Sequence, residues 1–266
     1  VDLGPLALAK LREGKPALIA LRELLEADPS REVRQIGIVD VAGTSAAFTG
    51  RDCVAEAGHV SGSGMSAQAN MVERADTWLA MQVAFGTATG DLAERMLEAL
   101  RAAEREGGDI RGTRSASLVV APGAPAAKPW VRRLDLRVDL SPRPLDDLAG
   151  LLRGARAFEA FDAAFEANRA GDLATVLDRT TEAYALEPDD ARIAFWHSMA
   201  LLANGHAEEA RPVLFGALGS EPRMAEFARR YVEAGHGGPL TAVLEEVGSA
   251  PLVPTLRPAE RARRGG

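Results

Sequence analysis

The sequence has few cysteines, fewer basic than acidic residues and no long apolar runs, and each of these shortages excludes a class of protein. Cys53 is the only cysteine among 266 residues, so no internal disulfide can form. Basic residues are outnumbered: the net charge is −7 and the pI about 5.3, which gives no general positive field for nucleic acid or an anionic membrane. No window approaches the roughly 18 to 20 continuous apolar residues of a membrane-spanning helix. We therefore predict a soluble protein with no nucleic-acid or membrane partner.

The start of the chain also lacks an initiator methionine and a signal-peptide pattern. Val1 leads almost directly into the apolar spacing of a first helix, with Pro5 in a first-turn position. We expect an upstream segment to precede Val1. The predicted location is cytoplasmic, unless that segment carries a signal.

The chain is 47% hydrophobic and 26% charged, a composition typical of a globular protein. Two kinds of hydrophobic pattern divide it into two parts. Up to about residue 140, helical spacing alternates with strands, of which residues 134–140 are the clearest because apolar and charged residues alternate strictly. From residue 145 onward every periodic segment is helical. We predict an α+β domain over 1–140 and an all-α domain over 145–247. The last residues, 248–266, contain several prolines and arginines and are predicted to be a disordered tail.

The all-α part repeats itself every 34 residues. This offset separates Gly171 from Gly205, Ala183 from Ala217, Pro188 from Pro222 and Phe161 from Phe195. The period matches the tetratricopeptide repeat, in which small residues let paired helices approach and a proline follows the second helix. We predict tetratricopeptide-like repeats here, which could bind a protein partner, form a homo-oligomer or only extend the domain.

Two short polar segments in the first domain are candidate binding sites. The glycine-bounded loop 107–115 leads into a buried strand and contains Asp109 and Arg111, and an arginine fork suits a carboxylate. The alternative is that these two residues form a pair that orders the loop. Gln68 and Asn70 alternate and would lie on one face of a strand, where they could bind a ligand or be satisfied by backbone groups.

Other motifs point to no cofactor or metal. The Gly62–Ala67 stretch fits G-x-G-x-x-A, but no convincing strand precedes it and no helix follows directly, so a turn between strands accounts for it better. The four histidines and the lone cysteine lack the spacing of metal ligands.

Four stretches, taken in order, resemble a prokaryotic family known as domain of unknown function ten-twenty-eight. They are Gly4-Pro5 with its helices, REVRQIGIVD at 31–40, GGDIRG at 107–112 with Ser115-Ala116, and DLRVD at 135–139. The resemblance covers about residues 1–140, and the chain departs from the family pattern at Ala69, Arg114 and Leu140. It implies an N-terminal-nucleophile-hydrolase-like fold, an αββα sandwich. The family pattern begins with strands upstream of Val1, so the sandwich is expected to be partial, with an unpaired strand edge and uncovered apolar faces.

The resemblance also implies a chemistry. Enzymes with this fold use an N-terminal Thr, Ser or Cys whose own α-amine is the general base, with amide donors forming an oxyanion hole. Val1 has no nucleophilic atom, so no catalytic residue is identified in this chain and the nucleophile is expected upstream. By position, Gln68 and Asn70 would contact the substrate or oxyanion, and Asp109 and Arg111 would orient groups or bind a carboxylate.

Two functions follow as hypotheses. The first is an amide-bond hydrolase acting on an unidentified small-molecule or peptide amide. The alternative is a catalytically inactive sandwich that serves as an interaction scaffold through its helical repeats.

Overall fold

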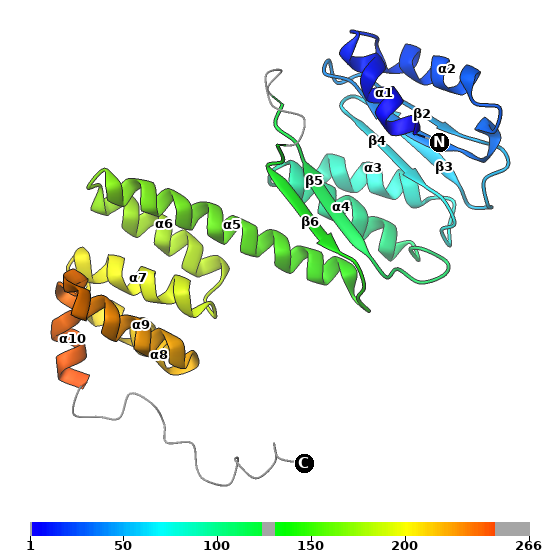
Figure 1. Cartoon of the computed structure of the whole chain (residues 1–266). Coiled ribbons are helices and arrows are strands. Elements are labelled where there is room, and N and C mark those ends of the chain that lie inside the picture. The colour runs from blue at the N-terminus through cyan, green and yellow to red at the C-terminus, as the bar shows by residue number, and fades with distance from the viewer. Residues whose placement is uncertain (1, 124–130, 248–266) are drawn as a thin grey trace. The chain divides into compact units, whose positions relative to one another are not determined.

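The computed structural model describes residues 2–123 and 131–247, which form two compact units, Val1–Leu152 and Arg153–Gly266 (Figure 1). The predicted tail at 248–266 lies outside the described residues. Within the described ranges, no helix has both the length and the apolar character that a bilayer crossing requires.

The first unit mixes helices with three small antiparallel sheets, each of two strands among the residues described. Its helices are α1 (Leu3–Arg12), α2 (Ala17–Ala27), α3 (Thr77–Thr87) and α4 (Leu92–Arg105), with a 3₁₀ turn η1 (Arg31–Val33). Its strands are β1 (Gln35–Val39), β2 (Ser45–Thr49), β3 (Gly58–Gly62), β4 (Met65–Ala69), β5 (Ala116–Val120) and β6 (Leu134–Val138). They pair as β1–β2, β3–β4 and β5–β6.

Helices α1 and α2 cover one face of the β1–β2 hairpin. Their small and apolar side chains form a buried core with the inward residues of the hairpin. The core residues are Ala7, Ala17, Ala20, Leu21, Leu24, Ile38 and Ala46. Asp40 joins these elements, because its carboxylate accepts a hydrogen bond from Ala17 N at the start of α2 (3.0 Å) and from Thr44 N in the hairpin turn (2.9 Å). These bonds hold the pKa of Asp40 below its ordinary value.

The β3–β4 hairpin lies between β1–β2 and α3. Gln35 Nε2 of β1 donates to the carbonyl oxygens of Gly58 (3.1 Å) and Ala69 (2.8 Å), which ties the two hairpins together. Side chains alternate along β4, so the buried Ala67 and Ala69 face one way and Gln68 faces the other. The space above Gly37 of β1 is filled by the Gln68 amide, which leaves no room for a Cβ there. The contacts therefore run in the order α1–α2, β1–β2, β3–β4, α3.

Helix α4 packs against α3 and β5. It begins with a reciprocal capping box between Asp91 and Glu94. The strand predicted over residues 134–140 ends earlier, at Val138. Within it Leu134 is buried while Asp135 and Arg137 are exposed, as predicted, but Leu140 lies beyond the strand and is 72% exposed. Helix α3 begins at Thr77, because the residues just before it form a turn.

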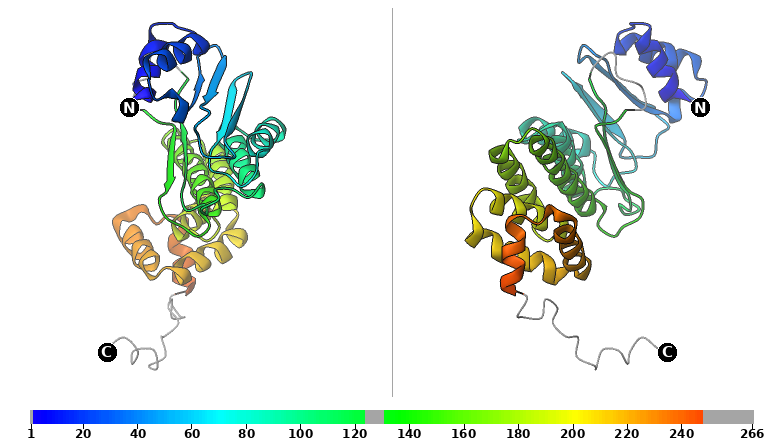
Figure 2. Two further views of the ribbon diagram at one scale, coloured as in Figure 1. Left: turned by 90° about the vertical axis from the view of Figure 1, so that its right-hand side faces the viewer. Right: turned by 60° about the vertical axis from the view of Figure 1, so that its left-hand side comes forward.

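In its described residues, up to Val247, the second unit contains helices and the turns that join them. Helix α5 (Pro144–Arg169) begins in the first unit, and α6 (Leu173–Leu186), α7 (Ala191–Ala203), α8 (Ala207–Ser220), α9 (Pro222–Tyr231), a π-helical turn η2 (Val232–His236) and α10 (Pro239–Val247) follow (Figure 2). The bounds of α8 lie 34 residues after those of α6. The turns before these two helices place Gly171 and Gly205 in the left-handed region, with φ of 75° and 84°. The 34-residue period of the sequence is thus a period of the helices.

Candidate functional site

The loop that follows α4 is fastened to the end of β4. Ile110 N donates to Met71 O (3.0 Å), Glu73 N donates to Gly108 O (3.1 Å), and Val72 pairs with Asp109 in an antiparallel bridge. These bonds bring Asp109 to the end of β4, close after Asn70.

Two adjacent glycines make this loop geometry feasible. Gly107 and Gly108 have φ of 108° and 64°, a region that side chains disfavour. A Cβ at Gly107 would also meet the side chain of Glu73, and one at Gly108 would meet Glu104. The glycine pair that bounded the candidate loop in the sequence therefore sets its path.

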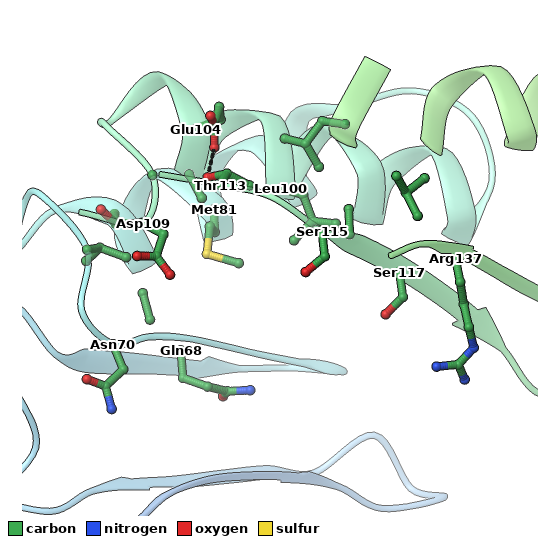
Figure 3. Close-up of a pocket in the computed structure, with 18 of the residues that line it drawn as sticks. Gln68, Asn70, Met81, Leu100, Glu104, Asp109, Thr113, Ser115, Ser117 and Arg137 are labelled. Atoms are coloured by element: carbon green, nitrogen blue, oxygen red, sulfur yellow. Dashed lines mark hydrogen bonds between the residues drawn. The ribbon is translucent and has the colours of Figure 1, made fainter. Parts of the chain in front are cut away.

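A cavity of about 630 Å³ lies between β4, the 108–113 loop, and the β5–β6 hairpin, with α3 and α4 forming its apolar wall (Figure 3). Gln68, Asn70 and Asp109 line this cavity, whereas Arg111 does not. Three of the four predicted site residues, separated by up to 41 positions in sequence, are therefore brought together in one place.

The two amide side chains differ in how they are satisfied. Gln68 Oε1 accepts a hydrogen bond from Ser66 Oγ (2.9 Å) and packs over Gly37. Asn70 Oδ1 is buried and has no hydrogen-bond partner among the described residues. A buried acceptor without a partner is costly, so Asn70 is the side chain here most in need of a donor.

Asp109 and Arg111 form the pair that the sequence left open as the alternative to ligand binding. Arg111 donates from Nε to Oδ1 (2.9 Å) and from Nη2 to Oδ2 (2.7 Å), and its backbone N also donates to Oδ1 (2.9 Å). Chiefly because of the side-chain bonds from Arg111, the pKa of Asp109 falls to about 2. The arginine fork is thus engaged within the loop, and its side chain is 67% exposed.

Four polar residues that the sequence analysis did not propose as site residues line the other side of the cavity: Ser115, Ser117, Arg137 and Asp139. The alternation of β6, and the Ser-Ala-Ser pattern entering β5, were the signals that could have shown them. Glu104, also in the wall, accepts a hydrogen bond from Thr113 Oγ1 (2.6 Å). Among the residues described, no group of three or more His, Cys, Asp or Glu side chains is placed to hold a metal ion.

A match to a protein-family model shows which family the chain belongs to. Residues 1–148, more than half of the chain, match the model described as "Family of unknown function (DUF1028)". The chain belongs to this family. The matched range includes every residue of the cavity described above.

A solved member of DUF1028 is similar to this chain. The crystal structure of protein SPO2555 from Silicibacter pomeroyi is 30% identical and has a TM-score of 0.50, over 57% of this chain and 66% of that one. The chain therefore spans just under two thirds of the length of this relative. No curated protein matches the chain.

The DUF1028 cavity has the parts of a binding site for a polar molecule with an apolar section. Met81 and Leu100 supply apolar surface, Asn70 supplies an unused acceptor and amide donors, and the hydroxyls of Ser115 and Ser117 lie opposite. Neither hydroxyl has a hydrogen bond to a basic side chain among the described residues. The cavity thus places hydrogen-bonding groups beside apolar surface, which is the usual composition of a ligand pocket.

Proposed function

We propose that this DUF1028 chain supplies the substrate-binding shell of an amide-bond hydrolase of the N-terminal-nucleophile type. The nucleophile is proposed to lie on a segment upstream of Val1, and the substrate is a small-molecule or peptide amide. The observation that carries the proposal is Asn70, whose Oδ1 is buried without a partner in the wall of a 630 Å³ cavity. Its Nδ2 would donate to the developing oxyanion, and its Oδ1 would accept from the substrate or the nucleophile's amine.

The layer order supports the same proposal. Helices α1–α2, hairpin β1–β2, hairpin β3–β4 and helix α3 follow one another in contact, the order expected of a partial αββα sandwich. Strands β4 and β5 each have an edge with no partner strand among the described residues, and both line the cavity. A further strand carrying the nucleophile could pair there and approach Asn70.

Exposed apolar side chains on α3 are a second observation that supports the proposal. This helix is apolar on all sides, yet Leu79 is 46% exposed and Val83 62% exposed. Helices of that composition are normally buried. An additional segment of the protein would bury this surface.

The test uses the gene product with its natural start and a panel of acyl-amide substrates. Asn70→Ala is expected to lower kcat/KM by roughly 10²-fold to 10³-fold, the usual effect of removing one oxyanion donor. Asn204→Ala, which makes the same change in the second unit, serves as the control. Full turnover by the Asn70→Ala variant would remove Asn70 from the mechanism.

A second candidate function, an interaction scaffold, is favoured by the second unit. Helices of this unit line an apolar groove of about 150 Å³, whose residues include Phe161, Phe165, Trp196 and Tyr231. Phe165 is 39% exposed and makes an edge-to-face contact with Trp196 (5.6 Å between centroids). If this groove binds a protein segment, Phe165→Asp abolishes capture of that partner, whereas Phe215→Asp, at a similarly exposed position (37%) outside the groove, leaves it unchanged.

A further inference from the structure

The β5–β6 hairpin presents three hydrogen-bond donors to the cavity from one face. Ser117 of β5 lies directly opposite Arg137 of β6 in the antiparallel register. Ser115 lies two residues before Ser117 and therefore on the same face. Figure 3 shows all three side chains directed to the same side of the hairpin. Cross-strand partners lie about 5 Å apart between Cβ atoms, so one small group can reach all three.

Most of these donors are unused among the described residues. The hydroxyls of Ser115 and Ser117 have no hydrogen-bond partner in the part of the chain that the structure describes. Arg137 donates from Nε to Asp135 Oδ1 (3.0 Å), which leaves both terminal nitrogens of its guanidinium without a partner there. The Asp135 pair is exposed on both sides, so it holds the arginine only weakly.

The charges around the cavity indicate what these donors bind. Arg137 is the only cationic side chain among the described residues that line it, and Asp139, two residues later, adds a carboxylate to the same part of the lining. Asp109 is already neutralised by Arg111, and Glu104 accepts from Thr113. Figure 3 places Asp109 and Arg137 on opposite sides of the cavity, so the one positive charge of the lining lies at the hairpin, where it would attract an anionic group against the repulsion of the nearby Asp139.

We propose that Ser115, Ser117 and Arg137 bind a carboxylate, so that the substrate of the proposed hydrolase carries an acidic group. The guanidinium fork matches the two oxygens of a carboxylate, and the serine hydroxyls donate to their remaining lone pairs. The hydrocarbon part of the same molecule lies against Met81 and Leu100. This role was predicted for Arg111, whose fork is occupied, and the structure assigns it to Arg137 instead.

The carboxylate site rests on the proposed function only in that its ligand is called a substrate, because a carboxylate can bind there without being turned over. The experiment titrates phenylacetate and its neutral counterpart phenylacetamide into the ¹⁵N-labelled 266-residue protein and follows amide chemical shifts. Phenylacetate is expected to bind at least about tenfold more tightly, since hydrogen bonds to charged groups contribute strongly. The shifts should centre on Ser115, Ser117 and Arg137.

Three variants test the assignment. Arg137→Gln is expected to weaken phenylacetate binding about tenfold or more, and Ser117→Ala by a few-fold. Arg137→Lys, which keeps the charge but loses the fork, should fall between wild type and Arg137→Gln. As the control, Arg143→Gln makes the same charge change at a residue that does not line the cavity and should leave binding unchanged.

Several outcomes would overturn the inference. One is that phenylacetate and phenylacetamide bind equally tightly. Another is that Arg143→Gln weakens phenylacetate binding as much as Arg137→Gln does. The third is that Arg111→Gln weakens phenylacetate binding and Arg137→Gln does not. If phenylacetate binds as expected but the natural-start protein hydrolyses no amide, the carboxylate site stands and the proposed hydrolase fails. If the protein hydrolyses amides without selective carboxylate binding, the hydrolase stands and the carboxylate site fails.

Discussion

Arg111 holds both carboxylate oxygens of Asp109, with Nε 2.9 Å from Oδ1 and Nη2 2.7 Å from Oδ2. The pair closes a loop whose other bonds fasten it to Met71 and Glu73. Asp109 therefore reaches the cavity wall as an ionised group whose charge is already balanced.

The first prediction concerns the titration of Asp109. Its folded-state pKa of about 2 lies below the ordinary value of 3.8, so its contribution to stability is present above that ordinary value and is lost as the pH falls towards 2. Carboxyl ¹³C shifts should give a midpoint near 2 in the wild type and a higher midpoint in Arg111→Gln. Arg143→Gln should leave the Asp109 midpoint unchanged. An Asp109 midpoint that is the same in Arg111→Gln as in the wild type would contradict this account of the loop.

The second prediction concerns the start of α4. Asp91 Oδ1 accepts from Ala93 N (2.9 Å) and Glu94 N (3.2 Å), so Asp91→Ala should lower the free energy of unfolding by about 1 kcal/mol. Asp76 occupies the same position before α3 but makes no capping hydrogen bond, so Asp76→Ala is the matched control. Urea denaturation measures both, and equal losses in the two variants would argue against the capping box.

The third prediction concerns the contact between the first two hairpins. Gly37→Ala should destabilise the protein by less than the roughly 1 to 3 kcal/mol typical of overpacking, because the new Cβ would meet only the amide end of the flexible Gln68 side chain, which can move. The double variant Gly37→Ala with Gln68→Ala should recover part of that loss by freeing the space. Thermal unfolding compares the two. If the double variant is as unstable as the sum of the single variants, the two side chains are not in conflict.

Much of the fold could be predicted from local patterns. The β1–β2 hairpin follows from the strand pattern before Gly43, which takes φ of 77° in the turn. The capping box of α4 and the 34-residue helix period were also readable, because each depends on residues close in sequence or on a strict repeat. Patterns of this kind report which face of an element is apolar, and little more.

The candidate site could be predicted only in part, because its geometry depends on contacts between distant segments. Gln68, Asn70 and Asp109 were selected for being polar near strand ends, and they do line one cavity. The sequence could not show which arginine faces that cavity. Arg111 is turned to Asp109 by loop bonds that involve Met71, whereas Arg137 faces the cavity because of the β5–β6 register. Neither contact can be recognised from the residues next to these arginines in the sequence.

The central claim, an N-terminal-nucleophile hydrolase, is tested most directly by the mass of the mature protein expressed from its gene with the natural start. We predict a mass showing that processing, of a short leader or of the initiator methionine, exposes Thr, Ser or Cys upstream of the position of Val1, at the start of a strand. A mature protein that begins with a residue lacking a nucleophilic side chain would contradict the claim.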